Sequence, residues 1–179
     1  MLVKITARAW SLKILAMIDE GVPARQAPLL AASQASRSAF AASLRHLVDL
    51  HLLERNPGHG HPLRPEYRLT EAGVEYAGVA ARIMRSTPVS TESGLLRKSW
   101  TVPILAVTDR PRYFSEIRTD LGAVTDRALS QSLDVLHQQE WLRRDVDVSQ
   151  KPLRPMYQAT NTGVLISRAI DLRGEAQRR

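Results

Sequence analysis

The chain contains no cysteine. This absence excludes a disulfide scaffold, a thiol nucleophile, a zinc ribbon and an iron–sulfur site. The sequence also lacks any apolar run near the ~20 residues that a membrane-spanning helix needs. Its first ten residues, MLVKITARAW, hold no apolar stretch of the ~7–15 residues that export signals carry. We therefore expect a soluble, cytoplasmic protein that does not act at a membrane.

Lysine is scarce, with four Lys against 21 Arg. One interpretation is coding bias, since a G+C-rich genome favours arginine and alanine. The other is a polyanionic partner, because the planar fork of arginine matches phosphates and guanine edges. The net charge of +7 comes from 11 basic and 7 acidic residues in 1–89 and from 14 and 11 in 90–179. Both halves are only mildly basic, so total charge does not separate coding bias from a polyanionic partner. The positions of the arginines are the better evidence.

Enzyme signatures are absent from the sequence: it has no Gly-rich phosphate loop, no HExxH, no GxSxG and no clustered acid/base set. We expect neither catalysis nor a cofactor. His59 and His61 have no third ligand in their turn-rich segment, so we interpret them as a loop tip rather than a metal site. With 44% hydrophobic residues, the 179-residue chain is expected to form one large or two small folded domains.

An internal repeat organises the chain. The segment PLRPEYRLTEAGV at 62–74 recurs as PLRPMYQATNTGV at 152–164, a shift of 90 residues, and WSLKILA at 10–16 meets WTVPILA at 100–106 at the same shift. Between these anchors, the Ser43-Leu44 pair matches Ser132-Leu133 at a shift of 89. The sequence therefore predicts two copies of one module, at 1–85 and 97–179, joined by a polar linker over 86–96.

Each copy shows the same order of expected elements. In the first copy, apolar spacing and turn formers predict a first helix over 10–20, a short helix over 25–32, a longer helix over 36–50, strands over 53–56 and 66–69, and a closing helix over 71–84. In the second copy they predict the same elements in the same order: a first helix from 101, a short helix over 113–121, a longer helix over 125–138, strands over 142–148 and 156–159, and a closing helix over 161–173. Three helices followed by a hairpin predict a mainly α, α+β chain: a tandem winged helix-turn-helix with two pseudo-symmetric modules.

The second copy resembles the HxlR family of bacterial winged-helix transcriptional regulators. The resemblance lies in WT at 100–101, RYFSEI at 112–117, GAVTDRALSQSL at 122–133, LRR at 142–144 and PMYQATNTG at 155–163. The first copy is more drifted, with QAPLL at 26–30 and SQASRS at 33–38. MarR-like and PadR-like modules share much of this pattern.

Two departures from that family are visible. Its members usually hold one module and dimerise, whereas this chain holds two, so the resemblance implies that one chain supplies both half-dimers. Members usually carry a cysteine shortly before the tryptophan, and its absence argues against thiol-based redox sensing. The resemblance implies a DNA-binding transcriptional regulator, either a pseudo-dimeric monomer or a homodimer, with double-stranded DNA as its partner.

The polar outer face of each longer helix is the predicted DNA-binding surface, because leucines occupy the inner face. Arg37 and Arg127 are placed to reach guanine and Gln131 to reach adenine, whereas Asp126 and Asp134 count against the second copy. Arg64 and Arg154 at the wings are expected at phosphates or a narrow minor groove, unless duplication alone copied them or they pair with acids. The predicted DNA-binding residues are Ser36, Arg37, Ser38, Arg45, Arg64, Arg68, Thr125, Arg127, Ser130, Gln131 and Arg154.

Aromatic residues suggest a second kind of site. Most are expected in the core, but an aromatic cleft between two modules would suit a small hydrophobic effector, and its candidates are Trp10, Trp100, Tyr76 and Phe114. Three functions therefore stay open: a regulator that binds promoter DNA through two heads, a protein on the same scaffold that binds an antibiotic or another hydrophobic compound, and a protein-interaction module. If the protein is such a regulator, we expect the first and last helices of each copy to pack between the two copies.

Overall fold

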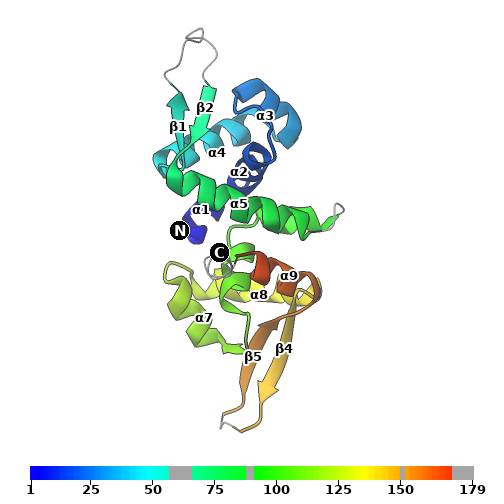
Figure 1. Cartoon of the computed structure of the whole chain (residues 1–179). Coiled ribbons are helices and arrows are strands. Elements are labelled where there is room, and N and C mark those ends of the chain that lie inside the picture. Colours follow the sequence, from blue (N-terminus) through cyan, green and yellow to red (C-terminus); the bar gives the residue numbers. More distant parts are fainter. Residues whose placement is uncertain (57–65, 88–90, 150–151, 171–179) are drawn as a thin grey trace, which may run out of the picture.

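The structure, a computed structural model, describes residues 1–56, 66–87, 91–149 and 152–170 (Figure 1). The first copy comprises α1 (Leu2–Thr6), α2 (Ser11–Asp19), α3 (Gln26–Ser33), α4 (Arg37–Asp49), β1 (Leu53–Asn56), β2 (Glu66–Leu69) and α5 (Glu71–Arg85). The 3-10 helix η1 (Thr91–Arg97) follows, mostly within the predicted linker. The second copy then comprises α6 (Thr101–Val107), β3 (Arg112–Tyr113), α7 (Phe114–Leu121), α8 (Asp126–Gln138), β4 (Leu142–Asp147), β5 (Arg154–Ala159) and α9 (Asn161–Ile170). The predicted tandem winged helix-turn-helix is confirmed.

The helix-turn-helix is built the same way in both copies. The first of its helices ends at a residue with positive φ, Gln34 at 62° and Gly122 at 66°, which turns the chain sharply. The second begins at an N-cap: Ser36 accepts a hydrogen bond from the Ala39 N–H, at 3.3 Å, and Thr125 accepts one from the Ala128 N–H, at 3.2 Å. Such a cap satisfies an amide that the first turn leaves unpaired. Equivalent caps therefore align α4 with α8, residue by residue.

The repeated Thr-x-x-Gly begins each closing helix, at the point where it crosses the backbone just after the longer helix, α4 or α8. Thr70 caps α5 by accepting from the Gly73 N–H, at 3.0 Å, while its hydroxyl donates to the carbonyl of His51, at 2.8 Å. A Cβ on Gly73 would lie 2.0 Å from the Leu52 carbonyl oxygen, and one on Gly163 would lie 2.1 Å from that of Trp141. Only glycine allows so close a crossing of two backbones.

The wings are antiparallel. β1 pairs with β2 from Leu53 opposite Leu69 to Asn56 opposite Glu66, and the second copy forms a three-stranded sheet in the order β3-β5-β4. Tyr67 and Tyr157 of the repeated segment are both buried, as expected for residues that anchor the hairpins. Residues 57–65, which include His59, His61 and Arg64, lie outside the described part of the chain.

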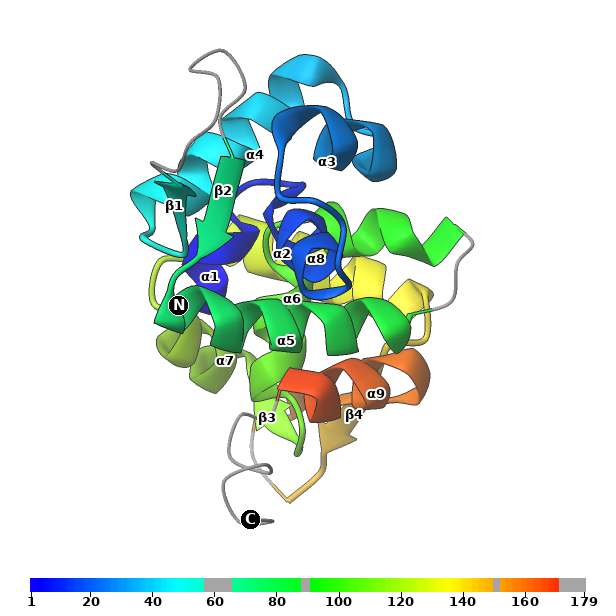
Figure 2. The ribbon, with the colours of Figure 1, turned by 45° about the horizontal axis from the view of Figure 1, so that its top comes forward.

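The two copies share one continuous hydrophobic core. The last helices, α5 and α9, pack against each other as predicted, and they lie side by side in Figures 1 and 2. The first predicted helix, α2, packs on α5 of its own copy, and α6 instead meets α1, which the sequence did not predict. The Thr6 hydroxyl donates to the Ser99 carbonyl at 2.7 Å, and Arg82 Nε donates to the Ala169 carbonyl at 3.1 Å. Within the described residues, no helix is long and apolar enough to cross a bilayer.

Candidate nucleic-acid interface

Helix α4 of the first copy separates a core face from a polar face. Phe40, Leu44 and Leu47 are buried, as their helical spacing requires. The predicted DNA-binding residues of this helix and its cap, Ser36, Arg37, Ser38 and Arg45, are all exposed. The hydroxyls of Ser36 and Ser38 lie 3.3 Å apart at the helix start, where unpaired amides favour an anion.

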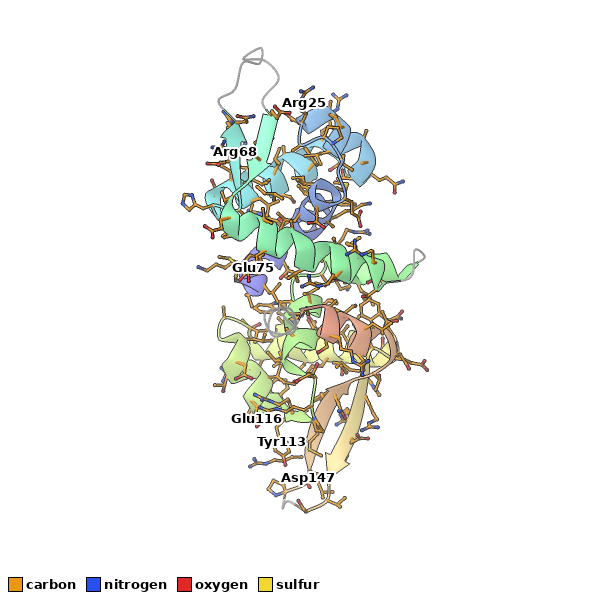
Figure 3. All side chains as sticks on the ribbon, in the orientation of Figure 1. Arg25, Arg68, Glu75, Tyr113, Glu116 and Asp147 are labelled. Atoms are coloured by element: carbon orange, nitrogen blue, oxygen red, sulfur yellow. The ribbon has the colours of Figure 1, made fainter. Side chains whose placement is uncertain are left out.

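The arginines of the first copy differ in their partners. Arg68 on β2 pairs with Glu54 on β1, with 2.6 Å between Nε and Oε1, and Arg25 pairs with Glu66 at 3.3 Å (Figure 3). Within the described residues, neither Arg37 nor Arg45 has an ion-pair partner. Both positive charges of α4 are therefore available to a polyanion, whereas Arg68 first has to leave Glu54. Exposed pairs of this kind are worth only about 0.2–1 kcal/mol.

Helix α8 of the second copy presents the same face with different charges. Thr125, Arg127, Ser130 and Gln131, all predicted to contact DNA, are exposed. However, Asp126 stands where α4 carries Arg37, and Asp134 stands where it carries Arg45. Asp126 pairs with Arg118 of α7, at 2.5 Å. The two recognition helices thus have opposite charges at two equivalent positions.

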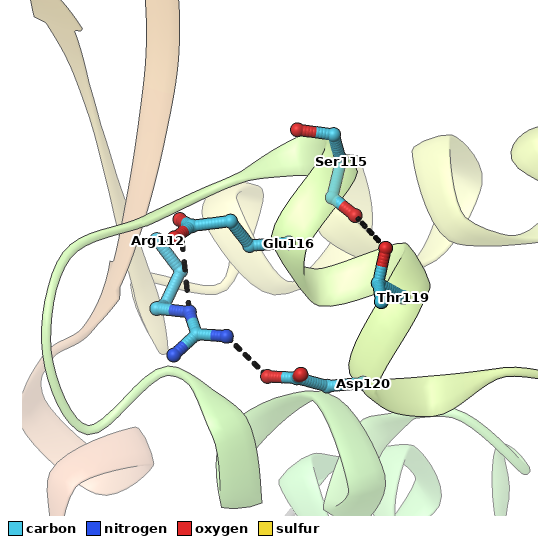
Figure 4. A pocket seen from close by; sticks show the side chains of 5 residues that line it. All are labelled: Arg112, Ser115, Glu116, Thr119 and Asp120. Atoms are coloured by element: carbon cyan, nitrogen blue, oxygen red, sulfur yellow. Dashed lines mark hydrogen bonds and ion pairs between the residues drawn. The ribbon is translucent and has the colours of Figure 1, made fainter.

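Helix α7 adds acidic residues to the second copy. Arg112, only 15% exposed, pairs with Asp120 and lies 3.7 Å from Glu116 Oε2 (Figure 4). Glu116 also accepts a hydrogen bond from the Tyr113 N–H, at 2.8 Å. This cluster fixes the start of α7 and leaves one net negative charge. Its counterpart α3, in the first copy, contains no charged residue at all.

The wing of the second copy is tied to the helix-turn-helix. The Tyr113 hydroxyl donates to the Asp147 carboxylate, and these two residues lie together beside the β4–β5 hairpin in Figure 3. The predicted contact residue Arg154 is exposed, and its Cα lies opposite that of Asp147 in the strand register. Hydrogen bonds from Ser149 and then Tyr113 hold the pKa of Asp147 below its usual range, and the bond to Asp147 raises the pKa of Tyr113.

This link predicts a pH dependence. Because folding lowers the pKa of Asp147, its contribution to stability is complete above its unfolded value, about 3.9, and is lost as the pH falls through the folded value. We expect Asp147→Asn to lower the melting temperature by a constant amount between about pH 5 and 9, and by less below about pH 4. Thermal melts followed by circular dichroism measure this difference. A difference that persists unchanged at about pH 3 would contradict the role of the ionised carboxylate.

The four aromatic candidates lie in different surroundings. Trp10, Trp100, Tyr76 and Phe114 are each partly buried against the core. Trp100 lines an open hollow of about 570 Å³, and the other residues that line it are Lys98, Ala128, Gln131, Ser132, Asp134 and Val135. The Trp10 ring is covered instead by two cations, with Arg97 at 5.0 Å and Lys13 at 5.6 Å from its centroid. The hollow therefore joins one predicted effector residue to one predicted DNA contact, Gln131.

Sequence reasoning missed two features of this region. Trp141 is fully buried directly after α8, at the position of Leu52 in the first copy, and the alignment of the two copies could have placed it in the core. Glu116 and Asp120 of the Arg112 cluster could have been found from their i,i+4 spacing, which places them on one face of the predicted helix, with Arg112 just before its start. In the described part of the chain, no three His, Asp or Glu side chains gather as a metal site would require.

The two copies are both matched by one known protein family. The family described as HxlR-like helix-turn-helix matches twice, at residues 5–87 and 95–173. Among solved structures, the chain is similar to the reduced form of the transcriptional regulator YodB from B. subtilis, with 28% identity over 46% of this chain and 82% of that one and a TM-score of 0.41. No curated protein matches.

Proposed function

We propose, because the chain belongs to the HxlR-like helix-turn-helix family, that it is a DNA-binding transcriptional regulator whose two copies are two unequal DNA-binding heads. The division into a first module at 1–85, a linker at 86–96 and a second module at 97–179 is part of this proposal. One chain would then supply both heads, which separate subunits supply in a dimeric helix-turn-helix regulator.

The observation that carries the proposal is the polar face of α4. It combines a capped helix N-terminus, two small hydroxyl side chains and two arginines without partners in the described residues. Small side chains allow a helix to approach the floor of the major groove, and arginine at such a position pairs with guanine O6 and N7. Arg68 and Arg154 on the wings would contact the phosphate backbone beside the groove.

The second head is expected to bind DNA more weakly than the first. Arg127, Ser130 and Gln131 offer base contacts, but Asp126 and Asp134 repel phosphates. We therefore propose that the first copy supplies most of the affinity, while the second adds contacts at fewer positions. An effector that binds beside α8 would then act on the weaker head.

Binding to promoter fragments tests the proposal. Electrophoretic mobility shifts with fragments of genomic promoters, the chain's own promoter included, should show binding that weakens steeply with salt. With four to six phosphates neutralised, the association constant is expected to fall about 10²–10³-fold between 50 and 200 mM salt. Failure to bind any promoter at 50 mM salt would contradict the proposed function.

A ligand-binding role without DNA is the second candidate, and the hollow beside Trp100 is the observation that favours it. A thermal-shift screen against hydrophobic natural products separates the two functions. Strong stabilisation by a compound, together with no affinity for any promoter, would favour the second candidate over the first.

A further inference from the structure

The hollow beside Trp100 lies on the flank of the second recognition helix. Ala128, Gln131 and Val135 follow helical spacing along this side of α8, and Trp100 comes from the turn that precedes α6. Its volume of about 570 Å³ is within the range of small-molecule sites. Trp100, Ala128 and Val135 supply the apolar part of its surface, and the remaining lining residues supply its polar groups.

The first copy shows what an indole at this position binds. Over the Trp10 ring, the guanidinium carbon of Arg97 lies 5.0 Å from the centroid and Lys13 Nζ lies 5.6 Å from it. Both distances fall in the range of cation–π contacts. Burial and then the positive charge of the neighbouring Arg97 lower the pKa of Lys13. The chain thus supplies its own cations to Trp10.

The Trp100 ring has neither of these cations at the equivalent positions. At the shift of 90 residues that relates Trp10 to Trp100, Arg97 corresponds to Ala7 and Lys13 to Pro103. Neither alanine nor proline carries a charge, and among the described residues no cation lies over the Trp100 ring. The Trp100 ring therefore lies beside an open hollow, whereas Arg97 and Lys13 cover the Trp10 ring.

The hollow also differs in charge from the equivalent surface of the first copy. Asp134, which lines it, occupies the position of Arg45 in the first copy. Asp134 has no ion-pair partner among the described residues. An indole face and a carboxylate both attract a positive charge, and the carboxylate repels phosphates and organic acids. Lys98, which also lines the hollow and is exposed like Asp134, opposes this attraction.

We propose that this hollow binds an organic monocation with a flat or methylated head, such as an amidinium, guanidinium or quaternary ammonium group. The head lies against the Trp100 ring and within reach of the Asp134 carboxylate, and the apolar body of the ligand lies over Ala128 and Val135. That the ligand regulates DNA binding rests on the proposed function, because Gln131 belongs both to the hollow and to the predicted DNA-binding face. When the ligand is bound, Gln131 contacts the ligand and no longer contacts the DNA.

Isothermal titration calorimetry of the full chain with benzamidinium, benzamide and benzoate tests the site. These probes share one aromatic body and differ in charge. We expect one benzamidinium per chain, with an affinity about tenfold or more above that of benzamide, and the weakest affinity for benzoate. Equal affinity for benzamidinium and benzamide, or no binding heat at millimolar benzamidinium, would overturn the proposal.

Three variants locate the site. Asp134→Asn should remove the preference for benzamidinium over benzamide, whereas Arg45→Gln, the matched change in the first copy, should leave it unchanged. Lys98→Met should strengthen benzamidinium binding, because it removes a like charge from the rim. Each position is exposed, and a thermal melt checks that folding is unaffected. An Asp134→Asn chain that keeps the full preference would contradict the assignment.

Promoter binding, measured separately without any probe, distinguishes the two claims. If promoter binding holds and benzamidinium does not bind, the hollow is not a cation site and the proposed function stands. If benzamidinium binds at Trp100 and no promoter is bound, the site stands as a ligand site and the regulatory function is wrong.

Discussion

Replacing Gly73 with alanine is expected to destabilise the protein by about 3 kcal/mol or more, a loss typical of a severe backbone clash. The added Cβ would lie 2.0 Å from the carbonyl oxygen of Leu52. Neither backbone can move away easily, because Thr70 caps α5 while its hydroxyl is bonded to the carbonyl of His51. Relief would require α5 to leave the end of α4, and with it the packing of α5 on α2 and α9. Urea unfolding of wild type and variant measures the loss.

Gly78 provides the matched control in the same helix. A Cβ there would meet nothing closer than Arg82 Nη1, at 3.7 Å, so Gly78→Ala should be neutral or stabilise by about 0.5–1 kcal/mol through helix propensity. Gly163→Ala should repeat the loss in the second copy, since its Cβ would lie 2.1 Å from the Trp141 carbonyl oxygen. If Gly73→Ala and Gly78→Ala unfold at the same urea concentration, this explanation of the repeated glycine is wrong.

Replacing Arg37 or Arg45 with alanine is expected to weaken promoter binding strongly. An arginine that pairs with guanine or with phosphate in the groove is worth about 1–3 kcal/mol, which is roughly 5–150-fold in affinity for each substitution. Neither side chain has an ion-pair partner among the described residues, so its removal breaks no ion pair in the fold. Folding should therefore remain intact, and mobility shifts at fixed salt give the loss directly.

The second copy supplies the opposite expectation. Asp126→Ala and Asp134→Ala, at the positions of Arg37 and Arg45, should leave promoter affinity unchanged or raise it, because each removes a negative charge that faces the DNA. Arg168→Ala on α9 is the control for net charge, since Arg168 is exposed and lies outside both predicted recognition helices. If Arg168→Ala weakens binding as much as Arg37→Ala, the loss reflects only the total charge of the protein.

The longer elements could be predicted from the sequence because local signals agree there. The caps at Ser36, Thr125 and Thr70 are each followed by apolar residues at helical spacing, and each cap forms its expected hydrogen bond. Because the repeat aligns the two copies, an element predicted in one copy is also predicted at the matching position of the other. The short elements α1, η1 and β3 carry no comparable signal, since a helix of five residues or a strand of two depends on tertiary packing.

The sequence predicts which helix faces form the candidate interface. It does not predict which of the charged residues there are paired with one another. The exposed sides of α4 and α8 follow from leucine spacing alone. That Arg68 pairs with Glu54 depends on the register of β1 and β2, and that Asp126 pairs with Arg118 depends on the angle between α7 and α8. The cations over Trp10 come partly from the other copy, through Arg97. Such contacts arise only when the copies pack together, and no local pattern encodes them.

Hydroxyl-radical footprinting of a bound promoter fragment tests the central claim most directly, namely that one chain places two unequal heads on DNA. Wild type should protect two patches, one deeper than the other. Arg37→Ala combined with Arg45→Ala should erase the deeper patch, and Gln131→Ala should reduce only the shallower one. A single protected patch, or two patches that fade equally with either change, would contradict the account.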